Sequence, residues 1–279
     1  MQINTISLFD GNRPRPPVKW AGGKGQLIPQ FAPLFPKQKF NLYIETFVGG
    51  GAVFFHLLPL KAIIIDNNPE LINFYTIVRD KLQALLADLE KHQNNEEYFY
   101  SIRALDPDKL DAVCRASRFL YLNKTGYNGL WRVNKKGKYN VPFGQYKNPK
   151  IADKENLQQV SRVLQQTEII LGDFSKALDF ILPGTFVYLD PPYHPLSESA
   201  NFTSYTASSF GAYDQRRLAE VFKQLDERGC LVMLSNSDTL FIWELYKGYD
   251  IKIVNARRAI NCSAEKRGPI PELVIRNYF

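Results

Sequence analysis

Short apolar runs alternate along this chain with longer stretches in which apolar residues recur at helical spacing. Runs rich in β-branched and aromatic residues predict buried strands at 42–46, 62–65, 168–171, 186–189, 231–234, 251–254 and 273–275. Helical spacing predicts helices at 25–34, at 52–58, across most of 69–122 and at 154–164. This alternation is typical of an α/β fold with a Rossmann-like, mainly parallel sheet. Because no helix separates the last two strands, we expect them to form an antiparallel hairpin at one edge.

Residues 69–152 interrupt this alternation. They begin with the helical pattern and end in a loop-rich stretch, 123–149, that has no regular apolar spacing. We therefore expect one domain built from residues 1–68 and 153–279, and a second domain inserted at 69–152.

Positive charge is concentrated in the inserted segment. The whole chain of 279 residues carries 35 basic and 28 acidic residues, a formal net charge of +7. Between Asp111 and Asp153 lie nine Lys or Arg residues and no acidic one, so the remainder has 26 basic against 28 acidic residues. The same stretch holds rings that could stack on bases: Tyr127, Trp131, Tyr139, Phe143 and Tyr146. A local basic face with interleaved aromatic residues indicates nucleic acid as the partner.

The remaining composition excludes several classes of protein. Cys114, Cys230 and Cys262 are odd in number and far apart, so we expect neither a disulfide framework nor a metal knuckle. The three histidines show no ligand spacing either, and we expect no metal. No apolar run approaches the roughly 18 residues of a membrane span, and the first residues lack the layout of a signal peptide. We therefore expect a reduced, cytoplasmic protein that does not bind a membrane.

A corner of unusual chemistry follows the apolar run 185–189. Asp190-Pro191-Pro192-Tyr193 ends the predicted strand, because two prolines fix two φ angles and remove two backbone donors. The corner offers a carboxylate, backbone carbonyls and an aromatic ring. It suits a planar heteroaromatic amine, whose amino protons it can accept and whose ring it can stack. For the isolated tetrapeptide, a tight Asp-Pro turn is the alternative.

A glycine loop lies earlier in the chain, between a predicted strand and a predicted helix. Residues 45–51 read Glu-Thr-Phe-Val-Gly-Gly-Gly, at a position where open α/β sheets bind nucleotide-like ligands. Asp66 ends the next strand about 20 residues on, where an acid commonly holds ribose hydroxyls. The spacing is not G-x-G-x-x-G, and no G-x-x-x-x-G-K-[ST] loop is present, which disfavours nicotinamide cofactors and nucleoside triphosphates. S-adenosylmethionine, an adenosine without phosphates, fits this pattern, although glycines also serve ordinary tight turns.

These segments and several others, in their order along the chain, resemble the Dam-type DNA adenine methyltransferases, which modify the N6 amino group of adenine in GATC. The resemblance covers nearly the whole chain beyond residue 17. Its motifs are 19–24 (Lys-Trp-Ala-Gly-Gly-Lys), 47–51, 66–67, 127–132 (Tyr-Asn-Gly-Leu-Trp-Arg), 140–146 (Asn-Val-Pro-Phe-Gly-Gln-Tyr), 172–174 (Gly-Asp-Phe), 190–193, 202–205 (Phe-Thr-Ser-Tyr) and 234–238 (Leu-Ser-Asn-Ser-Asp). This chain has Thr46 where family members often have Pro, a difference that we do not expect to abolish cofactor binding.

The resemblance implies three sets of site residues. The catalytic residues would be Asp190, Pro191, Pro192 and Tyr193. The residues that bind S-adenosylmethionine would be Trp20, Lys24, Glu45, Phe47, Gly49, Gly51, Asp66, Asn67, Asp173, Phe174 and Asp190. The residues that bind DNA would be Lys19, Lys124, Tyr127, Asn128, Leu130, Arg132, Asn140, Pro142 and Tyr146. No metal is implied.

The function that follows from the resemblance is methyl transfer to adenine N6 in double-stranded DNA containing GATC, by a monomer with a Rossmann-like methyltransferase domain and a helical DNA-recognition insertion. Because a duplex hides this amino group, the base must be flipped out, at a cost of a few kcal/mol. Two alternatives are an RNA adenine methylase and a non-catalytic, sequence-specific DNA-binding module. The motifs at 127–132 and 140–146 oppose the first, and the intact corner at 190–193 opposes the second. The sequence leaves open whether a separately encoded restriction endonuclease is a partner.

Overall fold

The computed structural model describes residues 13–196, 210–256 and 269–279. The chain packs into two compact units. Unit 1 comprises Met1–Gly23 and Val48–Gly172, and unit 2 comprises Lys24–Phe47 and Asp173–Phe279. The expected division into a domain of residues 1–68 and 153–279 and an inserted domain at 69–152 stays a prediction. Cys262 and the motif at 202–205 lie outside the described residues.

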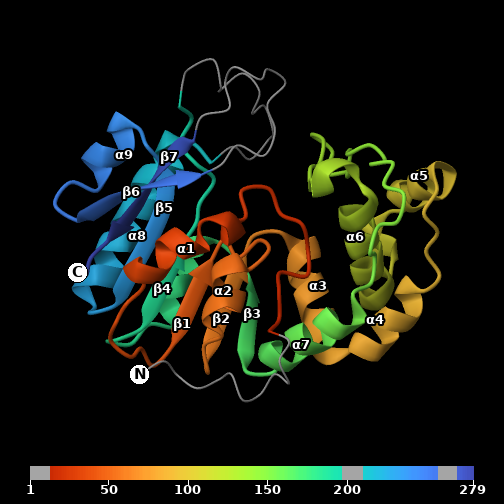
Figure 1. Cartoon of the computed structure of the whole chain (residues 1–279), viewed down its shortest axis with the longest axis horizontal. Coiled ribbons are helices and arrows are strands. Elements are labelled where there is room, and N and C mark those ends of the chain that lie inside the picture. The colour runs from red at the N-terminus through yellow and green to blue at the C-terminus, as the bar shows by residue number, and fades with distance from the viewer. Residues whose placement is uncertain (1–12, 197–209, 257–268) are drawn as a thin grey trace. The chain divides into compact units, whose positions relative to one another are not determined.

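Unit 1 is mainly helical (Figure 1). Its described strands, β2 (Ala62–Asp66) and β3 (Thr167–Leu171), pair in parallel. Its helical segments are α2 (Ala52–Leu57), α3 (Pro69–Asp80), α4 (Leu82–Leu89), α5 (Glu96–Ala104), η4 (Pro107–Lys109), α6 (Ala112–Thr125), η5 (Tyr127–Gly129) and α7 (Lys154–Leu164). Asn68, Asn95 and Asp111 begin α3, α5 and α6 by accepting hydrogen bonds from backbone N–H groups of the first turn. Helix α3 packs against α6 and α7.

Unit 2 contains the strands in the order β1-β4-β5-β7-β6. Their bounds are β1 (Tyr43–Thr46), β4 (Phe186–Leu189), β5 (Leu231–Ser237), β6 (Asp250–Ala256) and β7 (Ile270–Arg276). Strands β1, β4 and β5 pair in parallel, whereas β7 runs antiparallel to both β5 and β6. The helical segments are η2 (Lys24–Gln26), α1 (Ile28–Phe31), η3 (Ala32–Leu34), η6 (Phe174–Asp179), α8 (Ala212–Glu227) and α9 (Leu240–Leu245). The pairings confirm the predicted α/β fold with mainly parallel strands and an antiparallel edge hairpin.

Two elements differ from their predicted extent. The helix predicted at 25–34 is divided into η2, α1 and η3, because Pro29 and Pro33 lack the N–H that a continuous helix would use. Strand β5 continues beyond its apolar run through Ser235, Asn236 and Ser237. These polar residues stay in the strand because β7 pairs with them and their side chains are buried.

Every residue of β1, β2, β4 and β5 is buried, as expected of parallel strands that are covered on both faces. The buried polar residues gather toward the carboxyl ends of these strands: Glu45 and Thr46 in β1, Asp66 in β2 and 235–237 in β5. Asp190 follows the last residue of β4 directly. The carboxyl ends of the strands therefore carry the candidate chemistry. None of the described helices has the length and apolar character that crossing a membrane requires.

Candidate functional site

The corner at 190–193 places a buried carboxylate at the end of β4. The Asp190 side chain is 18% exposed, and its Oδ1 atom lies 2.9 Å from the Lys24 ammonium, which is itself buried. The Lys24 ammonium also acts as a hydrogen-bond donor to this carboxylate. Burial raises the pKa of Asp190, and the Lys24 charge lowers it in part. Lys24, which sequence analysis assigned to the cofactor, is thus an ion-pair partner of the predicted catalytic carboxylate.

Tyr193 is held from two sides. The Lys24 ammonium lies 4.7 Å from the centroid of its ring, over one face. Its hydroxyl donates a hydrogen bond of 2.7 Å to Oε2 of Glu272, on β7. Burial is the main cause of a raised pKa at Tyr193, with the neighbouring carboxylates of Asp190 and Glu272 adding to it. The phenol therefore keeps its proton and acts as a donor.

Buried amides fix the backbone that follows Pro191. The Gln215 side chain, on α8, donates to the carbonyl of Pro192 at 2.9 Å and accepts from the Asn236 amide at 2.9 Å. The other end of Asn236 accepts from the His194 N–H at 3.2 Å. Ser237 donates its hydroxyl proton to the carbonyl of His194 at 2.7 Å. Side chains from α8 and β5 thus determine the path of the corner.

The glycine loop of unit 1 is held by Asp66. One carboxylate oxygen accepts from the Gly49 N–H at 3.0 Å, and the other accepts from the Asn68 N–H at 2.9 Å. Gly49 has a φ of +49°, and a Cβ there would lie 2.5 Å from the Trp20 ring, so that only glycine fits. Gly51, with a φ of +70°, caps the N-terminus of α2. The structure brings Trp20, Gly49, Gly51 and Asp66 together, and Asp66 already has a structural role in the loop.

Phe47 and Phe174 form an aromatic cluster in unit 2. Their rings stack with centroids 5.4 Å apart, and Phe210 meets both rings edge-on at 5.6 and 5.8 Å. Arg217 lies over the Phe174 ring at 4.4 Å and donates to Asp173 at 2.5 Å. The other Asp173 oxygen caps η6 through the N–H of Ser175. Phe210 and Arg217 were not predicted from the sequence, because neither belongs to a local motif.

Glu45 and Asn67, two other residues assigned to the cofactor, differ in their burial. Glu45 is buried in β1 and accepts the hydroxyl proton of Tyr43 at 2.6 Å. Burial, together with the Glu45 charge, raises the pKa of Tyr43 far above its ordinary range, so this bond keeps its proton on the phenol. Asn67 is exposed directly after β2.

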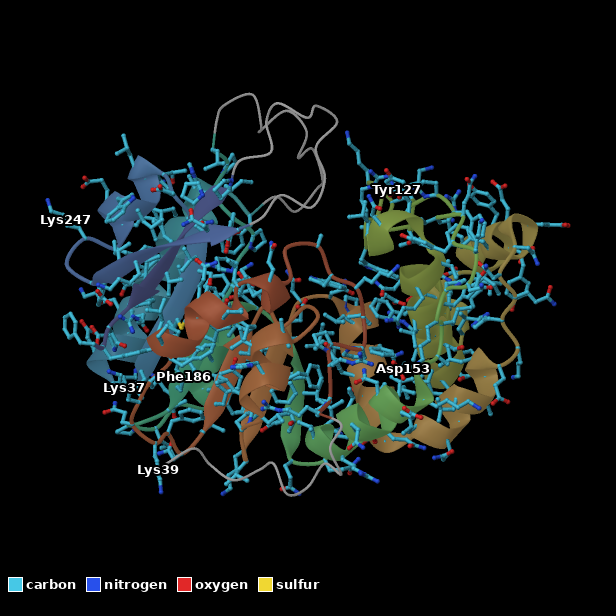
Figure 2. The ribbon with its side chains drawn as sticks, in the orientation of Figure 1. Lys37, Lys39, Tyr127, Asp153, Phe186 and Lys247 are labelled. Atoms are coloured by element: carbon cyan, nitrogen blue, oxygen red, sulfur yellow. The ribbon has the colours of Figure 1, made fainter. Side chains whose placement is uncertain are left out.

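The loop that follows α6 carries most of the predicted DNA-binding residues. Tyr127 is 51% exposed on η5 (Figure 2), and the next residue, Asn128, is exposed with a φ of +53°. Arg132 is also exposed, and its Nε donates to the Asn140 side chain at 2.7 Å. The Tyr127 N–H donates to the carbonyl of Pro142 at 2.9 Å. The motifs at 127–132 and 140–146 are therefore joined by hydrogen bonds into one loop structure and contribute to the same surface.

Lys19 and Tyr146 meet beside this loop, with the ammonium 4.1 Å from the ring centroid. Asn123, buried on α6, holds the Lys19 backbone with its side-chain amide: the oxygen accepts from the Lys19 N–H at 2.9 Å, and the nitrogen donates to the Lys19 carbonyl at 2.7 Å. Gly129 allows this close approach, because a Cβ there would lie 2.4 Å from the Lys19 side chain. Leu130 is partly buried and packs against the buried cluster that includes Tyr139.

Lys124 lies on α6. It lines a cavity of about 490 Å³ together with Arg15, Lys150 and Asp153. Arg15 and Lys150 both pair with Asp153, at 3.2 and 2.8 Å. Burial, and secondarily the charges of Lys19 and Arg15, lowers the pKa of Lys124 to about 8.

Sequence reasoning missed the residues that hold the corner in place. Glu272, Gln215 and Asn236 contact Tyr193, Pro192 and His194 across 79, 23 and 42 positions of sequence. Asn236 lies in the motif at 234–238, to which the sequence assigned no contact, whereas Glu272 and Gln215 belong to no motif.

Comparison with known proteins gives consistent results. Residues 20–260 match the family described as D12 class N6 adenine-specific DNA methyltransferase. Type II methyltransferase M1.LlaDCHI of Lactococcus lactis is 46% identical over 286 residues, which cover 100% of this chain and 98% of that protein. Type II methyltransferase M.MjaIII of Methanocaldococcus jannaschii is 43% identical, covering 95% and 99%. A DNA adenine methylase of Haemophilus influenzae is 37% identical, covering 93% and 92%.

Proposed function

The chain belongs to the D12 class of N6 adenine-specific DNA methyltransferases, and we propose that it methylates adenine within GATC of duplex DNA, on a base turned out of the helix. The chemistry of the family, methyl transfer to the N6 amino group of adenine in DNA, is the premise. The target sequence, the flipped base and the roles of individual residues are the proposal.

The observation that carries the proposal is the state of Asp190. Its Oδ1 is buried 2.9 Å from the Lys24 ammonium. A carboxylate has about four acceptor positions, so Asp190 can accept an amino proton in addition to its contact with Lys24. An adenine amino group has two protons, one for Asp190 and one for the carbonyl of Pro191. Among the described residues that carbonyl has no donor, whereas the carbonyl of Pro192 receives the Gln215 amide.

These two acceptors explain how an amino group becomes a nucleophile. The lone pair of N6 is delocalised into the adenine ring, and hydrogen bonds from both amino protons favour a geometry in which the lone pair points away from the ring plane. S-adenosylmethionine, the methyl donor that family membership implies, supplies an electrophilic methyl group on a sulfonium. As N6 gains the methyl group, the methyl–sulfur bond of the donor would break and leave a neutral thioether, and positive charge develops on N6. The Asp190 carboxylate stabilises this charge and then takes one of the amino protons. Tyr193 offers a ring face on which the adenine stacks.

We assign the donor to the residues whose chemical types suit it. Gly49 and Gly51 allow the left-handed backbone conformation of the loop that we assign to the donor. The Asp66 oxygens keep further lone pairs beyond the hydrogen bonds that they accept from Gly49 and Asn68, so a ribose hydroxyl can still donate to them. Phe47 and Phe174 are the aromatic residues that we place near the adenine ring of the donor, although in the structure they stack on each other and Arg217 lies over Phe174. Trp20, Glu45, Asn67 and Asp173 complete the assignment.

The loop surface of unit 1 is the proposed reader of the DNA. Exposed Tyr127 is suited to fill the space that a flipped base leaves. Asn140 orients the Arg132 guanidinium, because its side chain accepts from Nε at 2.7 Å and its backbone carbonyl accepts from Nη2 at 3.5 Å. The remaining N–H groups of Nη1 and Nη2 are suited to bidentate contact with a guanine. Lys19, Asn128, Leu130, Pro142 and Tyr146 are the other proposed contacts of this surface, and Lys124 contacts a phosphate. We expect the protein to act as a monomer.

The test is a methylation assay with labelled donor on a GATC duplex, on duplexes with one guanine pair replaced, and on an RNA of the same sequence. We expect methylation of the GATC duplex alone. Asp190→Asn should lower kcat at least about tenfold, because it weakens a charged hydrogen bond, while the Kd for DNA stays unchanged. Asp80→Asn, which alters an exposed surface ion pair with Arg79, is the matched control.

Each outcome has a distinct meaning. Wild-type turnover in Asp190→Asn would show that the Asp190 carboxylate is not needed for methyl transfer. Equal methylation of the substituted duplexes would show that GATC is not the target, and methylation of the RNA would show that the protein acts on RNA.

A further inference from the structure

Glu272 is a carboxylate of the active corner that no motif predicted. It lies on β7, opposite Ser237 of β5 in the antiparallel register, and is half-buried. Its Oε2 accepts the Tyr193 hydroxyl proton at 2.7 Å. A hydrogen bond to an ionised acceptor is among the stronger ones in proteins, and it fixes direction as well as distance.

The contacts of Tyr193 restrict how its ring can be used. Lys24 covers one face of the ring at 4.7 Å, and Glu272 fixes the hydroxyl end. The ring is therefore restrained about its long axis, and the face opposite Lys24 is left for a stacked base. Without the bond to Glu272, the phenol could tilt, and the plane offered to the adenine would no longer be defined.

The charge of Glu272 would be unfavourable if it served packing alone. Lys24 is already paired with Asp190 at 2.9 Å, so Glu272 adds a second carboxylate to the cluster. Its charge contributes to the raised pKa of Asp190 and thus acts against the ionised form of that residue. The hydrogen bond to Tyr193 is the contact that offsets this effect, which points to a role for the bond itself.

We infer that Glu272 is a positioning residue for methyl transfer, whose carboxylate sets the plane of the Tyr193 ring on which the target adenine stacks. The inference rests on the proposed function, because it takes Tyr193 as the stacking partner of the base. It assigns Glu272 no contact with the substrate. Its effect on the rate passes through the Tyr193 hydroxyl.

The test is a double-mutant cycle measured as kcat on a GATC duplex at saturating donor. Tyr193→Phe keeps the ring and removes only the hydroxyl, so it should lower kcat by about the same factor as Glu272→Ala, roughly tenfold or more. In the Tyr193→Phe background, Glu272→Ala should cost less than about twofold, because the bond is already absent. Glu272→Gln keeps an acceptor oxygen and should retain most of the activity. Glu168→Ala, at an exposed glutamate of β3, is the control.

The outcomes separate this inference from the proposed function. Unchanged kcat in Tyr193→Phe or Glu272→Ala, or the full loss from Glu272→Ala persisting in the Phe background, would overturn the role of Glu272 while wild type still methylates GATC. If Glu272→Ala does not fold, Tyr193→Phe and Glu272→Gln give the same decision, because full activity in the former overturns the inference. A wild-type protein that leaves the GATC duplex unmethylated would instead refute the proposed function.

Discussion

Removing the Gln215 amide should loosen the active corner and destabilise the fold together. Gln215 is fully buried on α8, where it donates to the carbonyl of Pro192 and accepts from the Asn236 amide, each at 2.9 Å. Gln215→Leu keeps a side chain of similar volume but removes both hydrogen bonds. It leaves the fully buried Asn236 amide without its acceptor, which costs about 1–3 kcal/mol, and the bond to Pro192 adds about 1 kcal/mol. We expect a loss of about 2–4 kcal/mol in the free energy of unfolding.

Thermal unfolding and methylation kinetics test this expectation together. For a protein of this size, 2–4 kcal/mol corresponds to a fall in Tm of roughly 3–7 °C. The freed carbonyl of Pro192 no longer fixes the corner, so kcat should fall while the Kd for DNA is unchanged. Gln224→Leu, on the same helix, removes a side chain that donates to exposed Glu220 and should change stability by less than about 0.5 kcal/mol.

Two results would refute the reasoning. A Tm for Gln215→Leu within about 1 °C of wild type would show that the two bonds contribute little to stability. An equal loss in Gln224→Leu would attribute the effect to helix α8 rather than to the corner.

Three further predictions concern charges. Burial raises the pKa of Asp190 and the Lys24 ammonium lowers it in part, so Lys24→Met should raise this pKa further. Because the carboxylate is the active form, the acid limb of the pH profile of kcat should move to higher pH in Lys24→Met and stay in place in Lys24→Arg. An unmoved acid limb in Lys24→Met would contradict the pairing of Lys24 with Asp190. The pKa of Lys124 is lowered to about 8, so DNA affinity should fall as pH rises from about 7 to 9 in wild type but not in Lys124→Gln. The slope of log affinity against log salt concentration should also be smaller by about 0.9 in Lys124→Gln. The same pH dependence in both proteins would rule out a contact between Lys124 and a phosphate. Arg132→Ala should lose preference at one guanine position by about 5- to 150-fold, corresponding to 1–3 kcal/mol, and a uniform loss at all positions would reassign Arg132 to the DNA backbone.

Local patterns in the sequence were sufficient where local forces decide the structure. The apolar run at 186–189 is a buried strand, and the helix predicted at 154–164 has those bounds, because Asp153 caps its N-terminus and its apolar face is buried. The helix predicted at 25–34 was too long because periodicity alone does not register the missing N–H groups of Pro29 and Pro33. The polar end of β5 was missed for the opposite reason, since pairing with β7 overrides its composition.

The candidate site shows the same limit more sharply. Asp190 and Tyr193 were named from the sequence because one tetrapeptide contains both. The residues that give the tetrapeptide its geometry come from η2, α8, β5 and β7, and no spacing rule connects them to it. Asp66 illustrates the converse, since its position after β2 predicted a ligand contact but not its bonds to the loop backbone. A short motif therefore specifies which chemical groups are present, whereas long-range contacts between buried polar side chains specify how they are aimed. For a reaction that depends on the alignment of an amine with a reactive methyl group, that aim contributes directly to the rate, so substitutions at Glu272 and Gln215 should impair catalysis although neither residue touches the substrate.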